Sequence, residues 1–159
     1  MKQLELAKWL QRIIILSAFV GLFLCFILAP WLGRDTVAMY PELSYMYLPC
    51  LIFIWITALP FYIALWKLWL ISCEISKDNS FCKENAHSLK LISKLALLEC
   101  LLYLAAIIFL LILNLLHPSI LLMALFIMFV GISMAVASAT LSHLVEKASD
   151  LKQENDLTI

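Results

Sequence analysis

The stretch from Ile13 to Leu32, IIILSAFVGLFLCFILAPWL, contains no charged residue. A helix rises about 1.5 Å per residue, so a helix of this length crosses about 30 Å, the thickness of the hydrocarbon core of a bilayer. Three further apolar stretches of similar length follow, at about 46–70, 95–116 and 120–141. The sequence therefore predicts four membrane-spanning helices.

The composition of the whole chain favours the same class of protein. Of 159 residues, 65% are hydrophobic and 14% are charged, whereas a soluble domain is about half apolar and about a quarter charged. The zero net charge excludes a strongly basic nucleic-acid-binding protein, and we expect no direct nucleic-acid contact. We expect one integral membrane domain over residues 1–159, an all-α four-helix transmembrane bundle with cytoplasmic helical extensions.

Prolines and turn-forming residues predict where the helices end or bend. Gly33-Arg34-Asp35-Thr36 is expected to end the first span. Pro49 is expected in the first turn of the second span, where it costs little, whereas Pro60 is interior and should kink the helix. Pro118 cannot continue the third helix, so a tight connection is expected there.

Lysine and arginine are distributed unevenly around the four spans. With the N-terminus inside, the inner segments include a polar loop at 72–93 and a tail at 143–159, and they hold ten of the eleven basic residues. Only Arg34 falls in an outer loop. Because basic residues are retained on the inner side, both termini are expected in the cytoplasm. Trp66 and Trp69 fall near the inner boundary, where indole rings are favoured.

Two polar residues fall within the predicted third span. Glu99 lies one turn into it, and an intramembrane carboxylate is costly enough to be a functional candidate, as part of a proton relay or a cation site. The alternative is an interfacial residue that is paired or extends towards water. Asn114 is the other polar residue, and an inter-helix hydrogen bond is its ordinary role.

Two charged faces are predicted near the inner boundary. Four residues share one helix face before the third span, here called the basic stripe: Lys83, His87, Lys90 and Lys94. Three carboxylates recur every four residues in the tail, here called the acidic face: Glu146, Asp150 and Glu154. The stripe is expected to attract anionic headgroups, or alternatively an acidic partner. We also expect the two faces to contact each other, at only ~0–1 kcal/mol per exposed pair.

Two motifs carry a resemblance to a known family. The loop reads Asn79-Ser80-Phe81-Cys82-Lys83-Glu84-Asn85-Ala86, and Leu89-x-x-Ile92 follows. The chain ends Leu151-Lys152-Gln153-Glu154-Asn155-Asp156-Leu157-Thr158-Ile159. Over nearly its full length the chain resembles the YoaS-like domain-of-unknown-function family of small bacterial membrane proteins. Members of that family have a phenylalanine and an E-N pair before the third span and a similar E-N-D-L-T-I ending.

The resemblance implies a four-span protein of the bacterial plasma membrane and carries no catalytic residues. Members are commonly encoded beside a small helix-turn-helix regulator, which implies a protein partner of that kind. Phe81, Glu84 and Asn85 are then candidate interaction residues, together with the basic stripe. Cys82 stands where a hydroxyl residue is frequent, so a hydroxyl N-cap is not expected.

The ending has its own physical interpretation. Glu154-Asn155-Asp156 is polar, and Leu157-Thr158-Ile159 is prone to β structure. Such a segment could insert into a pocket or add to a sheet edge of a partner. The alternative is a frayed end.

The sequence therefore predicts a membrane-anchored regulatory or interaction protein that needs no cofactor. The alternative is a small transporter, channel or immunity-type membrane protein. An enzyme is not expected, because no catalytic or phosphate-binding motif is present.

Small residues that could pack helices closely, within the chain or in a homo-oligomer, are Gly21, Gly131, Ala135, Ser138 and Ala139.

Overall fold

The computed structural model describes the backbone of residues 3–157 and the side chains of residues 3–155. Its elements are α1 (Gln3–Phe23), a π-helical turn (Leu24–Leu28), α2 (Ala29–Met39), a 3-10 turn (Pro41–Leu43), α3 (Ser44–Ser76), α4 (Lys83–Ile112) and α5 (Pro118–Leu157). Because α1, the π-helical turn and α2 are continuous, there are four long helical segments in the described part. All four are long and apolar enough to cross a membrane, which confirms the all-α, four-helix prediction.

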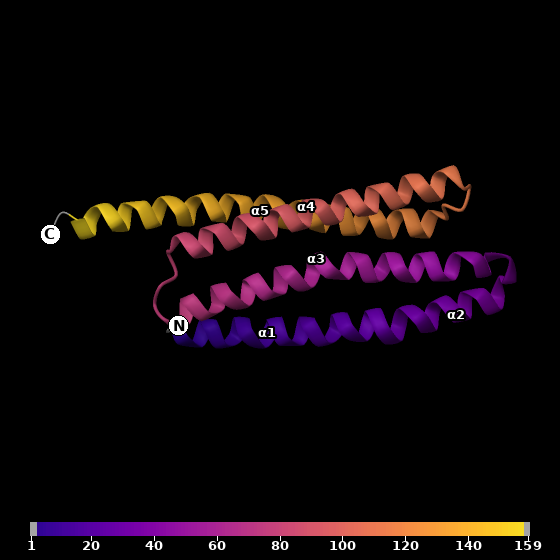
Figure 1. Ribbon diagram of the computed structural model, residues 1–159, viewed down its shortest axis with the longest axis horizontal. Coiled ribbons are helices and arrows are strands. Elements are labelled where there is room, and N and C mark those ends of the chain that lie inside the picture. The colour runs from indigo at the N-terminus through magenta and orange to yellow at the C-terminus, as the bar shows by residue number, and fades with distance from the viewer. Residues whose placement is uncertain (1–2, 158–159) are drawn as a thin grey trace.

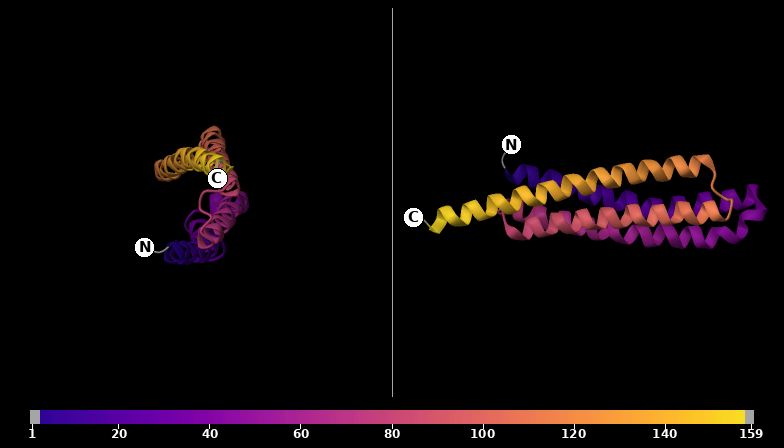
Figure 2. Two further views of the ribbon diagram at one scale, coloured as in Figure 1. Left: turned by 90° about the vertical axis from the view of Figure 1, so that its left-hand side faces the viewer. Right: turned by 90° about the horizontal axis from the view of Figure 1, so that it is seen from above.

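The helices pack in chain order and form an open, curved layer. Helix α3 packs on α1, α4 on α3, and α5 on α4, whereas within residues 3–157 α1 and α5 make no contact. Figure 1 shows two antiparallel helical hairpins side by side, and the end-on view in Figure 2 shows the four helices along an arc. Among the described residues, helix α5 therefore packs mainly on α4.

The expected break at Gly33-Arg34-Asp35-Thr36 is wrong, because α2 continues through it to Met39. The Thr36 hydroxyl donates to the Leu32 carbonyl (2.8 Å), a bond within the helix. Gly33 allows a close approach instead of a turn, since a Cβ there would lie 2.6 Å from Cε2 of Tyr47 on α3. A helix that is packed on a neighbour tolerates a glycine whose missing side chain makes the packing possible.

The two prolines of α3 both lie inside the helix. The expectation that Pro49 stands in the first turn is wrong, because the 3-10 turn Pro41–Leu43 leads directly into α3, which begins at Ser44. Pro60 stands at the middle of the helix, where it cannot donate a backbone hydrogen bond. Figure 1 shows the axis of α3 changing direction near its middle, as a kink at Pro60 predicts.

The turn between α4 and α5 corrects the expectation for Asn114. Helix α4 ends at Ile112, short of the predicted limit at 116, and Asn114 is exposed in the left-handed conformation with φ 55°. Its N–H donates to Leu111 O and that of Leu115 to Leu110 O, both at 3.0 Å. This is a Schellman ending, which suits asparagine because it tolerates positive φ. Asn114 therefore ends α4 and makes no inter-helix hydrogen bond through its backbone N–H.

A Schellman ending also stops α3. Asp78 has φ 62°, and the N–H groups of Asp78 and Asn79 donate to Ile75 O (3.2 Å) and Glu74 O (3.0 Å). The chain therefore leaves the helix at Lys77–Asn79, inside the expected polar loop. The expected polar loop at 72–93 is much shorter, since only residues 77–82 lie outside helices.

A ladder of hydrogen bonds joins α4 to α5. The Ser142 hydroxyl donates to Ala86 O (2.7 Å) and the Ser93 hydroxyl to Ala135 O (2.8 Å). Further along, the Cys100 thiol lies 3.6 Å from Met128 O. The contacts recur every seven residues on both helices, the repeat of antiparallel coiled-coil packing. The two hydroxyl bonds and the thiol contact together are called the α4–α5 ladder below.

Three of the five small residues expected to pack helices closely do so within this chain, whereas Ala139 is exposed. A Cβ at Gly131 would lie 2.7 Å from Cys100 Sγ on α4, and Ala135 is 2% exposed. A Cβ at Gly21 would lie 2.8 Å from the Tyr62 hydroxyl on α3, which itself donates to Ala18 O (2.9 Å). These positions are occupied by intramolecular contacts, so they do not argue for a homo-oligomer.

Candidate functional site

Most of the charged side chains gather at one end of the helical layer. This lysine-rich end comprises residues 3–12, 67–94 and 142–157. It holds the start of α1, the turn between α3 and α4, and the end of α5, which extends beyond that turn (Figures 1 and 2).

A small apolar core holds three helices together at the lysine-rich end. It consists of Ile71, Ala86, Leu89, Ile92 and Val145. Nearby, Ser72 is fully buried and its hydroxyl donates to Ala7 O (3.2 Å), which ties α3 to α1. Ala86 and Ile92 belong to the motif that carries the family resemblance, so part of that motif serves packing.

The turn between α3 and α4 is held by an ordered set of polar contacts. Glu74 accepts from Lys77 Nζ (2.7 Å) through Oε1 and from Asn79 Nδ2 (3.2 Å) through Oε2. These two hydrogen bonds from Lys77 and Asn79 hold the pKa of the Glu74 carboxyl below its ordinary value. The carboxylate is therefore stabilised as an anion at neutral pH.

The two residues of the Glu84-Asn85 pair in the motif have different roles. Asn85 is 3% exposed and its amide donates to Ser80 O (3.0 Å), so it closes the turn and is unavailable to a partner. The Ser80 hydroxyl in turn donates to Gln3 Oε1 (3.3 Å) on α1. Glu84 is exposed in the first turn of α4, where a carboxylate is favoured by the helix dipole.

Cys82 occupies the N-cap position of α4 and, as expected, makes no side-chain capping bond. Burial raises the pKa of its thiol, and a buried thiol is unreactive. The preceding residue, Phe81, is 57% exposed at the tip of the turn. An exposed aromatic ring beside the charged helix ends is a suitable anchor for another surface.

The expected contact between the basic stripe and the acidic face is confirmed at one pair. Lys83 Nζ lies 3.1 Å from Asp150 Oδ1, and both side chains are more than half exposed. Such a pair contributes only ~0–1 kcal/mol. His87, Lys90 and Lys94 are also exposed along α4, so the rest of the stripe faces outward.

The tail is helical for as far as it is described. Helix α5 continues to Leu157, with Ser149 buried and Leu151 59% exposed. Glu154 and Asn155 are exposed on this helix, and the backbone of Asp156 is helical. The β structure predicted for Leu157-Thr158-Ile159 is not found at Leu157, whose backbone is helical; Thr158 and Ile159 lie outside the described residues. Residues such as Leu151, Lys152 and Gln153 favour a helix, and the packed helix before them supplies its nucleus.

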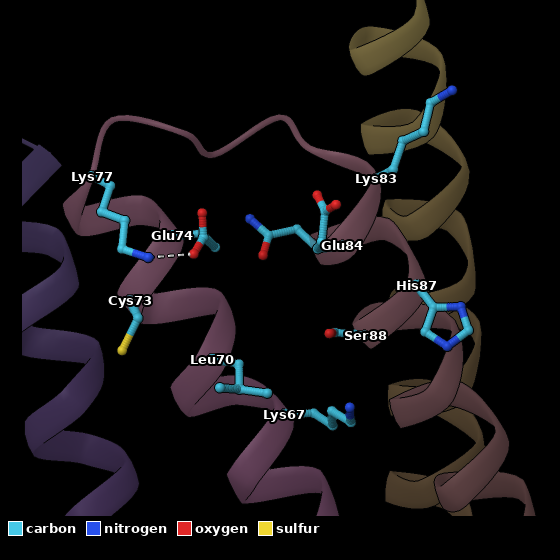
Figure 3. Close-up of a pocket in the computed structure, with 10 residues that line it drawn as sticks. Lys67, Leu70, Cys73, Glu74, Lys77, Lys83, Glu84, His87 and Ser88 are labelled. Carbon is cyan, nitrogen blue, oxygen red and sulfur yellow. Dashed lines mark hydrogen bonds and ion pairs between the residues drawn. The ribbon is translucent and has the colours of Figure 1, made fainter.

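A cleft of about 570 Å³ separates the ends of α3 and α4. Figure 3 shows Lys67 and Ser88 directed into the gap at its membrane side, while Lys83 and His87 point away from α3. The Glu74–Lys77 pair and Glu84 lie at its outer side. Sequence reasoning missed this cleft, although the single lysine at the end of a long apolar stretch was a signal for it.

Glu99 remains a candidate inside the apolar part of α4. Its Oε2 atom is buried and has no hydrogen-bond partner within the described residues. An unsatisfied buried carboxylate oxygen is costly. Among all the residues that the structure describes, no group of three or more histidine, cysteine or acidic side chains could hold a metal ion.

The four apolar helices and the charged end define a small multi-span membrane protein. The chain belongs to the family described as "Protein of unknown function (DUF2975)", whose sequence pattern matches residues 31–159. It is 30% identical over 153 residues to the uncharacterized membrane protein YoaS of Bacillus subtilis (strain 168), covering 95% of this chain and 96% of the relative. The resemblance inferred from the loop and the ending is thereby confirmed. No solved structure matches the chain.

Proposed function

We propose that the protein is a membrane-anchored interaction component without catalytic activity, in which the lysine-rich end faces the cytoplasm of a bacterial cell and binds a protein there. The positive-inside rule supports this orientation, since ten of the eleven basic residues belong to the segments on that side. The resemblance implies a small helix-turn-helix regulator as the partner.

The observation that carries the proposal is the protruding end of α5. The buried Ser142, Val145 and Ser149 anchor this helix against the rest of the chain. Beyond them, residues 150–155 are all exposed. A helix that is fixed at its base and open at its tip offers a preorganised surface, which lowers the entropy cost of binding.

The neighbouring contacts support a surface that a partner can enter. The Lys83–Asp150 pair is exposed and weak. A charged group of a partner can therefore replace Lys83 or Asp150 in this pair at a small cost in free energy. Phe81 lies exposed on the adjacent turn and supplies an apolar contact. A partner with both an apolar pocket and charged residues matches this combination.

The test is a cross-linked pull-down of the intact protein from membranes, compared with a chain that lacks residues 154–159. We expect a cytoplasmic protein to be captured by the intact chain and lost on truncation. Lys8→Gln provides a control, since it removes an exposed charge of the lysine-rich end that is not among the candidate interaction residues. Equal capture by the intact and truncated chains would contradict the proposal.

The side of the membrane on which the lysine-rich end lies can be measured separately. Protease added outside intact cells should leave the tail uncut, and it should cut the tail after the cells are opened. Cleavage in intact cells would place the lysine-rich end outside and overturn the proposed cytoplasmic partner.

A second candidate function rests on Glu99. Its unsatisfied buried oxygen favours a small transporter, channel or immunity-type protein acting within the membrane. In that case Glu99→Gln would abolish the cellular phenotype while truncation of residues 154–159 would preserve it. The reverse result favours the interaction component.

A further inference from the structure

The cleft between α3 and α4 contains an ammonium group without a counter-ion. Lys67 is partly buried and has no ion-pair partner within residues 3–157. Ser88, which is 7% exposed, directs its hydroxyl into the same gap from α4 (Figure 3). A partly buried lysine beside a hydroxyl is a donor pair suited to a phosphate oxygen.

The opposite charge lies at the other side of the cleft. Glu84 is exposed at the outer side and forms no ion pair among the described residues. The other charged groups that line the cleft are already matched, because Lys77 pairs with Glu74 and Lys83 with Asp150. The unmatched charges are therefore one lysine and one carboxylate.

The cleft lies where a phospholipid headgroup would be found. Trp66 and Trp69 flank Lys67 and mark the expected inner boundary of the bilayer. Basic pockets between membrane helices on this side bind lipid headgroups. The volume of about 570 Å³ is also within the range of small-ligand pockets.

We propose that this cleft binds the headgroup of a zwitterionic aminophospholipid, with the phosphate at Lys67 and Ser88 and the primary ammonium at Glu84. Ser88 and Glu84 stand one turn apart on α4, about 5–6 Å between Cβ atoms, and the short two-carbon linker of an ethanolamine headgroup suits this spacing. An anionic lipid would leave Glu84 facing a negative charge. A choline headgroup has no N–H to donate to the carboxylate.

The test is native mass spectrometry of the full-length protein in detergent with equal amounts of phosphatidylethanolamine, phosphatidylglycerol and phosphatidylcholine. We expect phosphatidylethanolamine to be retained preferentially. Lys67→Gln should lower its retention about tenfold, the effect of losing one charge-assisted hydrogen bond, and Lys67→Arg should preserve it. Glu84→Gln should remove the preference over phosphatidylcholine.

Lys8→Gln is the control, because Lys8 is exposed on α1, lies outside the basic stripe and does not line the cleft. Gel filtration of each variant verifies that it remains folded. Preferred retention of phosphatidylglycerol, or an equal loss in Lys67→Gln and Lys8→Gln, would overturn the proposal. Displacement of the lipid by an equal concentration of soluble phosphorylethanolamine would also overturn it, by reassigning the site to a free phosphorylated amine.

Discussion

The α4–α5 ladder leads to a quantitative prediction for the double variant Ser93→Ala, Ser142→Ala. Both hydroxyls are buried, and each donates to a carbonyl on the facing helix (2.8 and 2.7 Å). The variant removes two donors and leaves the acceptors, Ala135 O and Ala86 O, within helices where backbone N–H groups still reach them. No buried polar group is orphaned, so the loss is the net value of two hydrogen bonds.

The free energy that each hydrogen bond contributes depends on where the bond lies relative to the predicted spans. Ser93 precedes the predicted third span, which starts at about 95, so its hydrogen bond is worth about 0.5–1.5 kcal/mol. Ser142 lies beyond the predicted span, where about 0.5–1.5 kcal/mol is typical. The two bonds are two helical turns apart, about 10 Å, so their effects should be nearly additive. The double variant should lose about 1–3 kcal/mol.

The assay is reversible unfolding of the purified protein in mixed micelles, followed by tryptophan fluorescence. Ser133→Ala is the matched control, since its exposed hydroxyl bonds back to Phe129 O of the same helix (2.8 Å). The control should change the free energy of unfolding by less than about 0.5 kcal/mol. A double variant as stable as the control would refute the role of the ladder in holding α5.

Three further predictions concern packing, thiol reactivity and pH. Gly131→Leu should destabilise the helix pair by about 1–3 kcal/mol, because even a Cβ would lie 2.7 Å from Cys100 Sγ; unfolding in micelles measures this, and Gly131→Ala should cost less. Cys82, buried and with a raised pKa, should react with maleimide much more slowly in the folded than in the unfolded single-cysteine protein, and equal rates would contradict its burial. The pKa of Glu74 is lowered by Lys77 and Asn79, so its stabilising contribution is present above its ordinary value of 4.5 and is lost as the pH falls through the lower folded pKa. The difference in unfolding free energy between wild type and Glu74→Gln should therefore shrink between about pH 7 and pH 3, and a constant difference would argue against the contact.

The number and type of the helices could be predicted from the sequence because uncharged stretches of that length have one stable arrangement in lipid. The contact of Lys83 with Asp150 was also predictable, since helical spacing places charges on one face. Helix ends were less predictable. Gly33 and Asn114 have similar turn propensities, yet one lies inside a packed helix and the other ends one.

The site was only partly predictable because its residues meet through packing. Periodicity identifies Lys83 and His87 as neighbours on one helix, but it does not show that Asn85 is used within the turn. Nor does it place Lys67 of α3 opposite Ser88 of α4. Such pairs depend on how far one helix is shifted along the other, and this shift is fixed by the packing of the buried core that includes Ile71, Ala86 and Leu89.

Helix α5 is one uninterrupted rod of 40 residues, about 60 Å long at 1.5 Å per residue. Within residues 3–157 it packs mainly on α4, so this one contact surface and the thickness of the surrounding bilayer determine its tilt. A change in tilt of about 5° at one end would displace the other end by about 5 Å over this length. The length of the rod therefore makes the position of its exposed tip sensitive to the angle at which α4 and α5 pack.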